Sequence, residues 1–287
     1  MKYDASIESL IHPETLAPLP PSPALPWNTA ALCAELSRLA YFKDRDEVKA
    51  ACEAHKLGDP CFFDDDDVTG TQAFAVCGKG EQAGFIAFRG TQPKSLKDIL
   101  ADTRFKLDAW RGGGRVHTGF AWAYDGRKTA GVSSQIRAWL QEMRAQGWSG
   151  KLYVTGHSLG AALATLAAQA DFPDASLIIF GSPRVGDALF AARLKQRNVQ
   201  RYVNCCDLVT NLVIQDLIGY QNIAGERYID RNGQQSSSTS PITIAADRLR
   251  AAALYPLHSL RPWNVPSRDL ADHAMINYIS ALLGMRE

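Results

Sequence analysis

One stretch of the chain, Lys151–Ala170, constrains the fold more than any other part of the sequence. It reads as a short β-prone run, then G-H-S-L-G, then a segment of alanine and leucine with hardly a polar residue. A strand, a sharp turn and a buried helix around G-x-S-x-G form a nucleophile elbow, which raises the serine side chain above the strand end. Gly156 and Gly160 fit this geometry because a Cβ at either position would collide with a neighbouring element. The pattern predicts that Ser158 is a nucleophile; the alternative is a glycine-rich turn with an idle serine.

The length and composition of the chain fit one α/β domain preceded by an arm. Residues 13–26 hold six prolines, and proline disfavours a helix because it lacks an amide N–H and clashes with the preceding turn. We therefore expect an extended arm over residues 1–27 that lies against the domain; a disordered tail is the alternative. Residues 28–287 are expected to form a single domain, which is long enough to bury its own core.

The charge balance and the hydropathy of the chain argue against several classes of protein. With 31 basic and 30 acidic residues the net charge is +1, which argues against a nucleic-acid-binding surface. No apolar run approaches the ~18 residues that a membrane-spanning helix needs. The N-terminus has no apolar stretch after its first lysine, so a cleaved secretory signal is not expected. The sequence predicts a cytoplasmic location, with export by a route without such a signal left open.

The cysteine pattern gives no sign of a metal site. The six cysteines are Cys33, Cys52, Cys61, Cys77, Cys205 and Cys206. No pair has the C-x-x-C spacing of a zinc site, and we expect neither a metal ion nor an organic cofactor. Buried free thiols in a reducing compartment are the favoured interpretation, and one disulfide is left open.

Strands and helices alternate after the elbow, as they do in a sheet that is covered on both faces. Ser176–Phe180 is a fully apolar strand, which is typical of the interior of a parallel sheet. A helix from Asp187 and a strand over residues 201–204 follow. One helix is predicted over residues 120–146 and another, near the C-terminus, over residues 269–283. The expected fold class is α/β, with a mostly parallel central sheet flanked by helices.

A serine nucleophile needs a base and a group that orients the base. Only His258 and His273 follow Ser158 in the sequence. Asp187 and Asp207 each come just after a predicted strand, where the catalytic groups of open α/β sheets gather. The order serine, acid, histidine is typical of an elbow of this kind. We prefer Asp207 as the acid and His273 as the base. Asp187 is the alternative acid.

Two segments before the elbow are candidates for handling a substrate. A predicted hairpin over residues 71–88 runs into Arg89 and Gly90, after which Thr91 could present an amide or a hydroxyl to a ligand. Pro93–Ala101 is a short amphipathic segment whose apolar side chains are Leu96, Ile99 and Leu100. That segment is either a surface helix packed on the core or a lid over an apolar cleft.

Several of these stretches together resemble the fungal-type lipases, the class 3 lipase family of α/β-hydrolases. The matching stretches are Phe88–Thr91, Val116–Phe120, Thr155–Gly160, Phe180–Asp187, Arg201–Asp207 and Asp272-His273. They come in the family's order over about residues 71–278, which is most of the chain. Each stretch alone is unspecific, whereas the set is highly specific.

The resemblance implies a role for each matching residue. Ser158 corresponds to the nucleophile of a catalytic triad, Asp207 to the acid and His273 to the base. Thr91 corresponds to the oxyanion residue that follows the Arg-Gly pair, and Leu159 supplies the second backbone N–H.

The resemblance also implies a lid and an activity. Pro93–Ala101 corresponds to a short helical lid, whose Leu96, Ile99 and Leu100 would contact substrate and, transiently, a lipid surface. The implied activity is that of a triacylglycerol lipase, which cleaves carboxylic esters of lipids through an acyl-enzyme without a cofactor. The alternatives are a phospholipase, a short-chain or aromatic carboxylesterase, an acyltransferase on the same triad, and a catalytically idle hydrolase fold that serves as a binding module.

Overall fold

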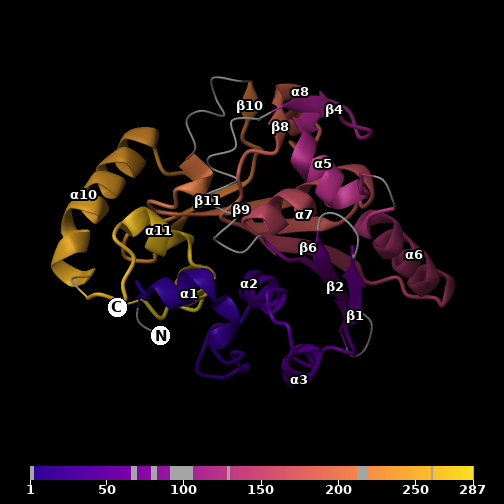
Figure 1. Ribbon diagram of the computed structural model, residues 1–287, viewed down its shortest axis with the longest axis horizontal. Coiled ribbons are helices and arrows are strands. Elements are labelled where there is room, and N and C mark those ends of the chain that lie inside the picture. The colour runs from indigo at the N-terminus through magenta and orange to yellow at the C-terminus, as the bar shows by residue number, and fades with distance from the viewer. Residues whose placement is uncertain are drawn as a thin grey trace.

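In a computed structural model of the chain, a central sheet carries helices on both of its faces (Figure 1). The residues that the structure describes are 3–65, 70–78, 83–90, 106–127, 130–211, 219–259 and 261–286. From one edge to the other, the strands of the sheet are β1 (Cys61–Asp64), β2 (Gln72–Cys77), β3 (Ala83–Phe88), β6 (Lys151–His157), β7 (Ser176–Phe180), β9 (Val199–Asn204), β11 (Glu226–Ile229) and β12 (Gln235–Ser236).

The middle of this sheet is parallel and its edges are antiparallel. Strands β3, β6, β7, β9 and β11 pair in parallel, which places their carboxyl ends along one edge of the sheet. The predicted hairpin before the elbow is the antiparallel pair β2–β3. Strand β12 pairs antiparallel with β11 at the far side. The mostly parallel sheet that the sequence predicts is therefore present, and β6, the strand that leads to Ser158, lies inside it.

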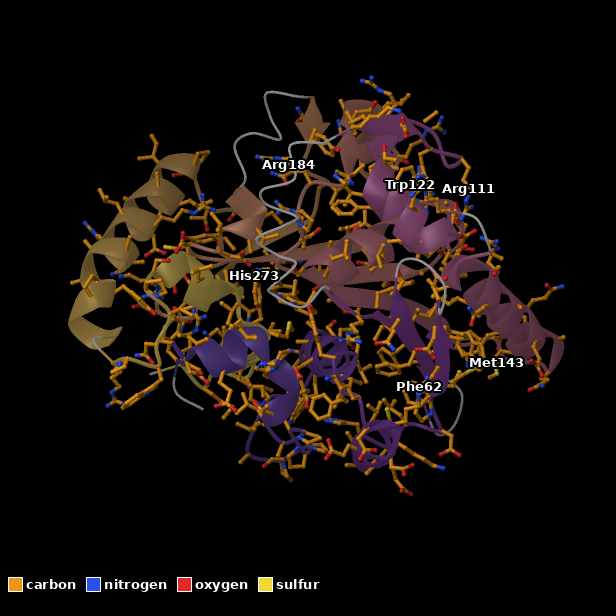
Figure 2. All side chains as sticks on the ribbon, in the orientation of Figure 1. Phe62, Arg111, Trp122, Met143, Arg184 and His273 are labelled. Atoms are coloured by element: carbon orange, nitrogen blue, oxygen red, sulfur yellow. The ribbon has the colours of Figure 1, made fainter. Side chains whose placement is uncertain are left out.

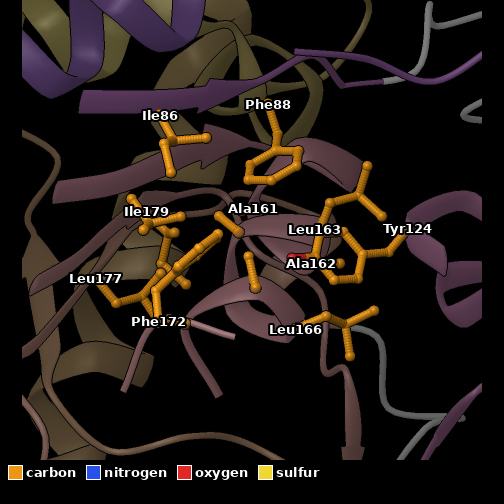
Figure 3. Packing of buried hydrophobic residues seen from close by; sticks show 14 of the residues in the cluster. Ile86, Phe88, Tyr124, Ala161, Ala162, Leu163, Leu166, Phe172, Leu177 and Ile179 are labelled. Atoms are coloured by element: carbon orange, nitrogen blue, oxygen red, sulfur yellow. The ribbon is translucent and has the colours of Figure 1, made fainter. Parts of the chain in front are cut away.

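Alternation along the strands divides the core between the two faces of the sheet. In β3, Ile86 and Phe88 belong to one buried cluster, whereas Phe85 and Ala87 belong to the other. Successive side chains of a strand point to opposite faces, so a strand that is apolar throughout must be covered on both. Figure 3 shows the first cluster, in which Ile86 and Phe88 pack beside the side chains of the helix that follows the elbow.

Helices cover each face of the sheet. On the face of the first cluster lie α5 (Thr118–Asp125), α6 (Val132–Ala145), α7 (Leu159–Ala170) and the short α8 (Ala188–Ala192). On the opposite face lie α2 (Thr29–Leu39), α3 (Arg45–Ala54) and α12 (Met275–Leu282). Helix α7 is buried along nearly its whole length, and its many alanines let it approach the sheet closely.

Two helices that the sequence predicts as continuous are each broken. Residues 120–146 form α5 and α6, because Gly126 ends α5 with a φ of 84°, which a glycine adopts without strain. Gly131 then packs so closely that a Cβ on it would lie 2.4 Å from the Gly126 nitrogen. Near the C-terminus, α11 (Arg268–His273) and α12 are separated by Ala274, which has extended backbone. The helix from Asp187 is also shorter than predicted, since α8 ends at Ala192.

A second, smaller sheet was not predicted. Its strands are β10 (Tyr220–Gln221), β8 (Gly186–Asp187), β5 (Arg115–His117) and β4 (Leu107–Ala109), in that order. These strands have at most three residues each, so they carry too little periodic pattern to be recognised in the sequence.

The N-terminal segment lies against the domain, as predicted, and it includes a short helix that the sequence analysis missed. The segment contains α1 (Ile7–Ile11) and the 3-10 turn η1 (Pro13–Thr15). Arg38 of α2 is fully buried and donates hydrogen bonds to the carbonyls of Pro13 and Ala17, at 2.9 and 3.0 Å. These bonds fix the proline-rich residues to α2. The division at residue 27 into an arm and a single domain stays a prediction.

The remaining described elements lie late in the chain. They are the 3-10 turn η2 (Val209–Asn211) and the long helix α10 (Pro241–Ser259). Helix α10 has 19 residues and holds Pro256 within it. Within the described ranges, no helix combines the length and the apolar character that crossing a membrane would require.

Candidate active site

Ser158 occupies a strained turn between β6 and α7, as the elbow pattern predicts. Its φ is 57° and its ψ is −124°, a backbone conformation that a residue with a side chain rarely adopts. The two glycines permit the turn: a Cβ on Gly156 would lie 2.3 Å from the Gly160 oxygen, and a Cβ on Gly160 would lie 2.3 Å from the Phe88 oxygen. Since both contacts involve backbone atoms, neither position has room for a side chain.

The structure brings Ser158, Asp207 and His273 together. The His273 Nε2 atom lies 3.1 Å from the Ser158 Oγ, and the His273 Nδ1 atom lies 2.9 Å from the nearer carboxylate oxygen of Asp207. A carboxylate only accepts hydrogen bonds, so Nδ1 carries the proton and Nε2 is free to accept one from the serine hydroxyl. All three side chains are buried. Figure 2 shows His273 in the middle of the molecule, at the end of α11.

The Asp207 carboxylate is held by two further donors. The Tyr278 hydroxyl donates to Oδ2 at 2.5 Å, and the Val209 amide donates to Oδ1 at 2.9 Å. Burial, followed by the charge of Asp207, raises the pKa of Tyr278 well above its ordinary value. Tyr278 therefore stays protonated and remains a donor. These bonds keep the carboxylate oxygens facing His273.

Gly181 makes room for this arrangement. It follows β7 with a φ of 58°, and a Cβ on it would lie 2.9 Å from the Asp207 Oδ2 and 3.2 Å from the His273 Cε1. Any side chain here would push the acid and the imidazole apart.

A second set of hydrogen bonds holds the backbone of His273. The His157 Nε2 atom lies 2.8 Å from the His273 carbonyl oxygen, and the His157 Nδ1 atom lies 3.0 Å from the Tyr41 hydroxyl. A carbonyl only accepts, so Nε2 of His157 carries a proton. Burial lowers the pKa of His157 well below its ordinary value, with a further contribution from nearby His273. His157 is therefore neutral, and its Nδ1 accepts from Tyr41.

The same tyrosine contacts the strand end that leads to the expected oxyanion residue. The Gly90 amide donates to the Tyr41 hydroxyl, and a Cβ on Gly90 would lie only 2.0 Å from that oxygen. Tyr41 therefore connects the end of the β3 strand, through His157, to the backbone of His273.

Only part of the predicted oxyanion site falls within the described residues. Leu159 opens α7, and the amides of a first helical turn have no carbonyl partner inside the helix. Its role as an oxyanion donor stays a prediction. Thr91 and the expected lid residues Leu96, Ile99 and Leu100 lie outside the described residues.

The alternative acid and an upstream histidine have structural roles. Asp187 accepts the Phe190 amide at 2.9 Å, which caps the N-terminus of α8, and it pairs with Arg115 at 3.1 Å. His117 accepts the Gly119 amide at 3.0 Å at the start of α5.

The cysteines form no disulfide, and one group of them lies near an aspartate. All six are free thiols, three of them buried and Cys61 exposed. Side-chain atoms of Cys205, Cys206 and Asp272 lie within 4.8 Å of one another. This group does not suit a cation, because Arg268 pairs with Asp272 at 3.2 Å and burial raises the pKa of Asp272.

Sequence reasoning missed the residues that hold the triad in place. Nothing in the pattern identified Tyr41, His157 or Gly181 as part of the site, because their contacts join segments that are far apart in the chain. The bond from Tyr278 to Asp207 was missed as well, since it joins the last helix to the end of β9.

The sequence of the chain is similar to those of known lipases. A family model described as "Lipase (class 3)" matches residues 85–217. Over 191 residues the chain is 32% identical to "Secreted mono- and diacylglycerol lipase A" of Penicillium cyclopium, with coverage of 63% of this chain and 59% of that protein. Over 158 residues it is 34% identical to "Phospholipase A(1) DAD1, chloroplastic" of Arabidopsis thaliana, with coverage of 46% and 34%. The chain thus spans well under two thirds of each of these relatives.

A solved structure of a lipase shares the fold. The Rhizomucor miehei lipase in its propeptide complex superposes with a TM-score of 0.61 and 27% sequence identity, over 77% of this chain and 78% of that one. This similarity confirms the expected fold class, a parallel-centred sheet flanked by helices.

The prediction of a cytoplasmic location is wrong. The Penicillium relative is named as a secreted lipase, which points to an extracellular location instead. The prediction rested on the lack of an apolar leader in the sequence, and that feature alone does not determine where a protein acts.

Proposed function

Because the chain belongs to the class 3 lipase family of the α/β-hydrolase superfamily, we propose that it hydrolyses carboxylic esters of lipids with Ser158 as the nucleophile. The observation that carries the proposal is the continuous contact from Ser158 through His273 to Asp207, at 3.1 and 2.9 Å. The substrate class is proposed from the similar proteins, one of which is named as a mono- and diacylglycerol lipase and another as a phospholipase.

The geometry supports an acyl-transfer mechanism in two steps. The Ser158 Oγ attacks the ester carbonyl as His273 Nε2 takes its proton, and His273 then passes that proton to the departing alcohol. Asp207 keeps the imidazole in the required tautomer and stabilises its charged form. A water molecule, deprotonated by His273, then releases the acid and restores Ser158.

Two backbone donors are proposed for the negative charge that develops on the substrate oxygen. The Leu159 amide, at the start of α7, is one donor, and Thr91 is proposed as the other on the strength of the family resemblance alone. Each such donor contributes ~3 kcal/mol to stabilising the transition state. Tyr41 supports the loop before Thr91 through its bond to Gly90.

The surroundings of the reaction are proposed from the relatives. We infer that the protein acts outside the cell, as the name of the Penicillium lipase suggests. The segment Pro93–Ala101 is proposed as a lid that contacts a lipid surface transiently.

The first experiment measures hydrolysis of p-nitrophenyl esters with acyl chains from acetyl to palmitoyl. Ser158→Ala should lower the rate by ~10⁶-fold, as in comparable triads, because the proposed acyl-enzyme forms on the Ser158 Oγ. A maximum at long chains would support a lipase, whereas a maximum at two to four carbons would indicate a short-chain esterase. If Ser158→Ala were about as active as the unmodified protein, the assignment of Ser158 as the nucleophile would be refuted.

The choice of acid has a matched pair of variants. Asp207→Asn should lower kcat by ~10⁴-fold, because an amide at this position favours the wrong imidazole tautomer. Asp187→Asn should keep nearly full activity, since asparagine also caps a helix well. The opposite ranking of the two variants would mean that Asp187 is the acid.

A phospholipase is the second candidate, and the Arabidopsis relative favours it. Phosphatidylcholine and a triacylglycerol of the same acyl chain, offered in parallel, decide between the two by their kcat/KM values. Covalent labelling by an organophosphonate tests another alternative, a catalytically idle binding module, because an idle site would not react.

A further inference from the structure

A cavity lies at the end of the molecule where the N- and C-termini meet. Its volume is about 850 Å³, within the ~300–1,000 Å³ that is usual for small-molecule sites. Figure 1 shows α1, α10 and α11 gathered there with both chain ends. Neither Ser158 nor His273 is among the described residues that line it, so this cavity is separate from the candidate active site.

Hydrogen bonds between distant segments form part of the cavity wall. The Ile7 amide donates to the Trp263 carbonyl at 2.8 Å, and the Val265 amide donates to the Ala5 carbonyl at 2.8 Å. Ser6 and Asn264 pair between these two bonds as an antiparallel bridge. The N-terminal segment is thereby fixed against the loop after α10, and the cavity has an ordered wall.

The cavity carries an excess of positive charge. Its arginines are Arg231, Arg261, Arg268 and Arg286. Arg231 pairs with Asp247 at 2.5 Å, and Arg268 pairs with Asp272 at 3.2 Å. Asp4 is the one acidic residue among the described residues that line the cavity. Of the four arginines, Arg261 alone has no carboxylate partner among the described residues.

Two of these arginines keep donors that the described protein groups do not satisfy. The Arg261 guanidinium lies 6.0 Å from the centre of the Trp263 ring, and no described carboxylate pairs with it. The Nε of Arg286 is buried without a hydrogen-bond partner among the described residues, whereas its Nη2 bonds the Asn204 Oδ1 and the Asn277 carbonyl, both at 3.0 Å, and lies 4.0 Å from Asp272. Arg261 is therefore the arginine whose charge is available to an anion in the cavity.

Apolar side chains stand beside these cations. Trp263 is 60% exposed and Leu254 is 46% exposed, and both line the cavity together with Tyr255. Large apolar side chains that remain exposed next to a pocket are typical of a binding surface. A ligand for this cavity therefore needs an anionic end and an apolar body.

We propose that this cavity binds one long-chain carboxylate, with the carboxylate on Arg261 and the chain along Leu254 and Trp263. A carboxylate accepts two parallel hydrogen bonds from a guanidinium group, so it suits an arginine without a carboxylate partner. Inorganic phosphate offers nothing to the apolar wall. Ester hydrolysis releases such a carboxylate, and only this link to the reaction rests on the proposed function.

Calorimetric titration of the full chain with decanoate, below its micelle-forming concentration, tests the proposal. Decanoate should bind the unmodified protein, and Arg261→Gln should weaken its affinity by about tenfold through the loss of a charged hydrogen bond. Trp263→Ala should weaken it similarly. Both side chains are exposed, so neither change threatens folding. Arg250→Gln is the matched control, because Arg250 is an exposed arginine of α10 outside the cavity.

Three further ligands distinguish the contribution of the negative charge to binding affinity from that of the apolar chain. Decanol and decyltrimethylammonium should each bind at least tenfold more weakly than decanoate, and inorganic phosphate alone should not displace decanoate. Equal decanoate affinity in Arg261→Gln and the unmodified protein would overturn the proposal, as would equally tight binding of decyltrimethylammonium or displacement by phosphate. Because no ester is present, the result does not depend on whether Ser158 supports hydrolysis.

Discussion

At the scale of single residues, the base of the candidate triad is held at both its side chain and its backbone. Asp207 fixes the His273 ring, and His157 fixes the His273 carbonyl at 2.8 Å. His157 is in turn held by Tyr41, whose hydroxyl also accepts the Gly90 amide. We infer that Tyr41 is a positioning residue for both the base and the loop that leads to Thr91.

Replacement of Tyr41 by phenylalanine tests this role. Tyr41→Phe should lower kcat by about tenfold with little change in KM, because loss of a buried hydrogen-bond partner costs ~1–3 kcal/mol and misplaces groups used only during the reaction. The measurement is steady-state kinetics on a p-nitrophenyl ester. Tyr153→Phe is the control, since Tyr153 stacks on Phe85 away from the site. An unchanged kcat, or a change confined to KM, would refute the positioning role.

At the scale of elements, the close approach of α7 to the end of β3 builds the site. A Cβ on Gly160 would meet backbone atoms of Phe88 at 2.3 Å and Gly90 at 3.0 Å. The first turn of α7 and the strand end before Thr91 therefore pack backbone to backbone. This contact brings the first turn of α7 next to the backbone of Gly90.

Substitution of Gly160 by alanine should disturb both elements. The added methyl group must displace backbone, so Gly160→Ala should lower the free energy of unfolding by ~1–3 kcal/mol and reduce activity at least tenfold. Urea unfolding and ester hydrolysis measure the two effects. In the control Gly78→Ala, the new Cβ lies 3.5 Å from its nearest neighbour, an ordinary contact. Equal stability of the two variants would contradict the close packing.

The break between α11 and α12 shows how an element boundary serves the site. Ala274 has extended backbone, so the His273 carbonyl leaves the helical pattern and accepts from His157 instead. A continuous helix over residues 269–283 would direct that carbonyl into its own hydrogen-bond ladder. The predicted continuous helix is thus wrong at the residue where the fold needs an interruption.

At the scale of the whole molecule, His157 ties together segments from three parts of the chain, and this makes stability depend on pH. Burial lowers the pKa of His157 well below its ordinary value, so the unfolded chain binds a proton near pH 6.5 that the folded protein does not. The stabilisation that comes from keeping His157 neutral is therefore complete above pH 6.5 and is lost as the pH falls below it. The free energy of unfolding should therefore decline below pH 6.5 by up to ~1.4 kcal/mol per pH unit.

Urea unfolding between pH 8 and pH 5 measures this dependence. His157→Asn should be less stable at pH 8 and should show a shallower decline below pH 6.5. His12→Asn is the control, since the His12 side chain is 52% exposed. An equally steep decline in His157→Asn would show that other groups cause the dependence.

The local pattern was enough to predict the fold class and the nucleophile, and it left two candidate acids. The elbow motif, the apolar strands and the order of serine, aspartate and histidine are properties of short stretches, so they can be recognised in the sequence. Asp187 and Asp207 both follow a predicted strand; Asp207 was preferred, and it also matches the acid of the family that the chain resembles. The structure separates them by contact, since Asp187 caps α8 while Asp207 faces His273.

Tertiary structure alone decided what surrounds those residues. The bonds from Tyr278 to Asp207 and from Tyr41 to His157, and the space left by Gly181, join segments that no local pattern relates. The small sheet and the arginine-lined cavity arise in the same way, from short segments that acquire meaning only when the chain is folded. Periodicity and propensity report on neighbours in sequence, whereas these features depend on long-range packing, which only the assembled molecule specifies.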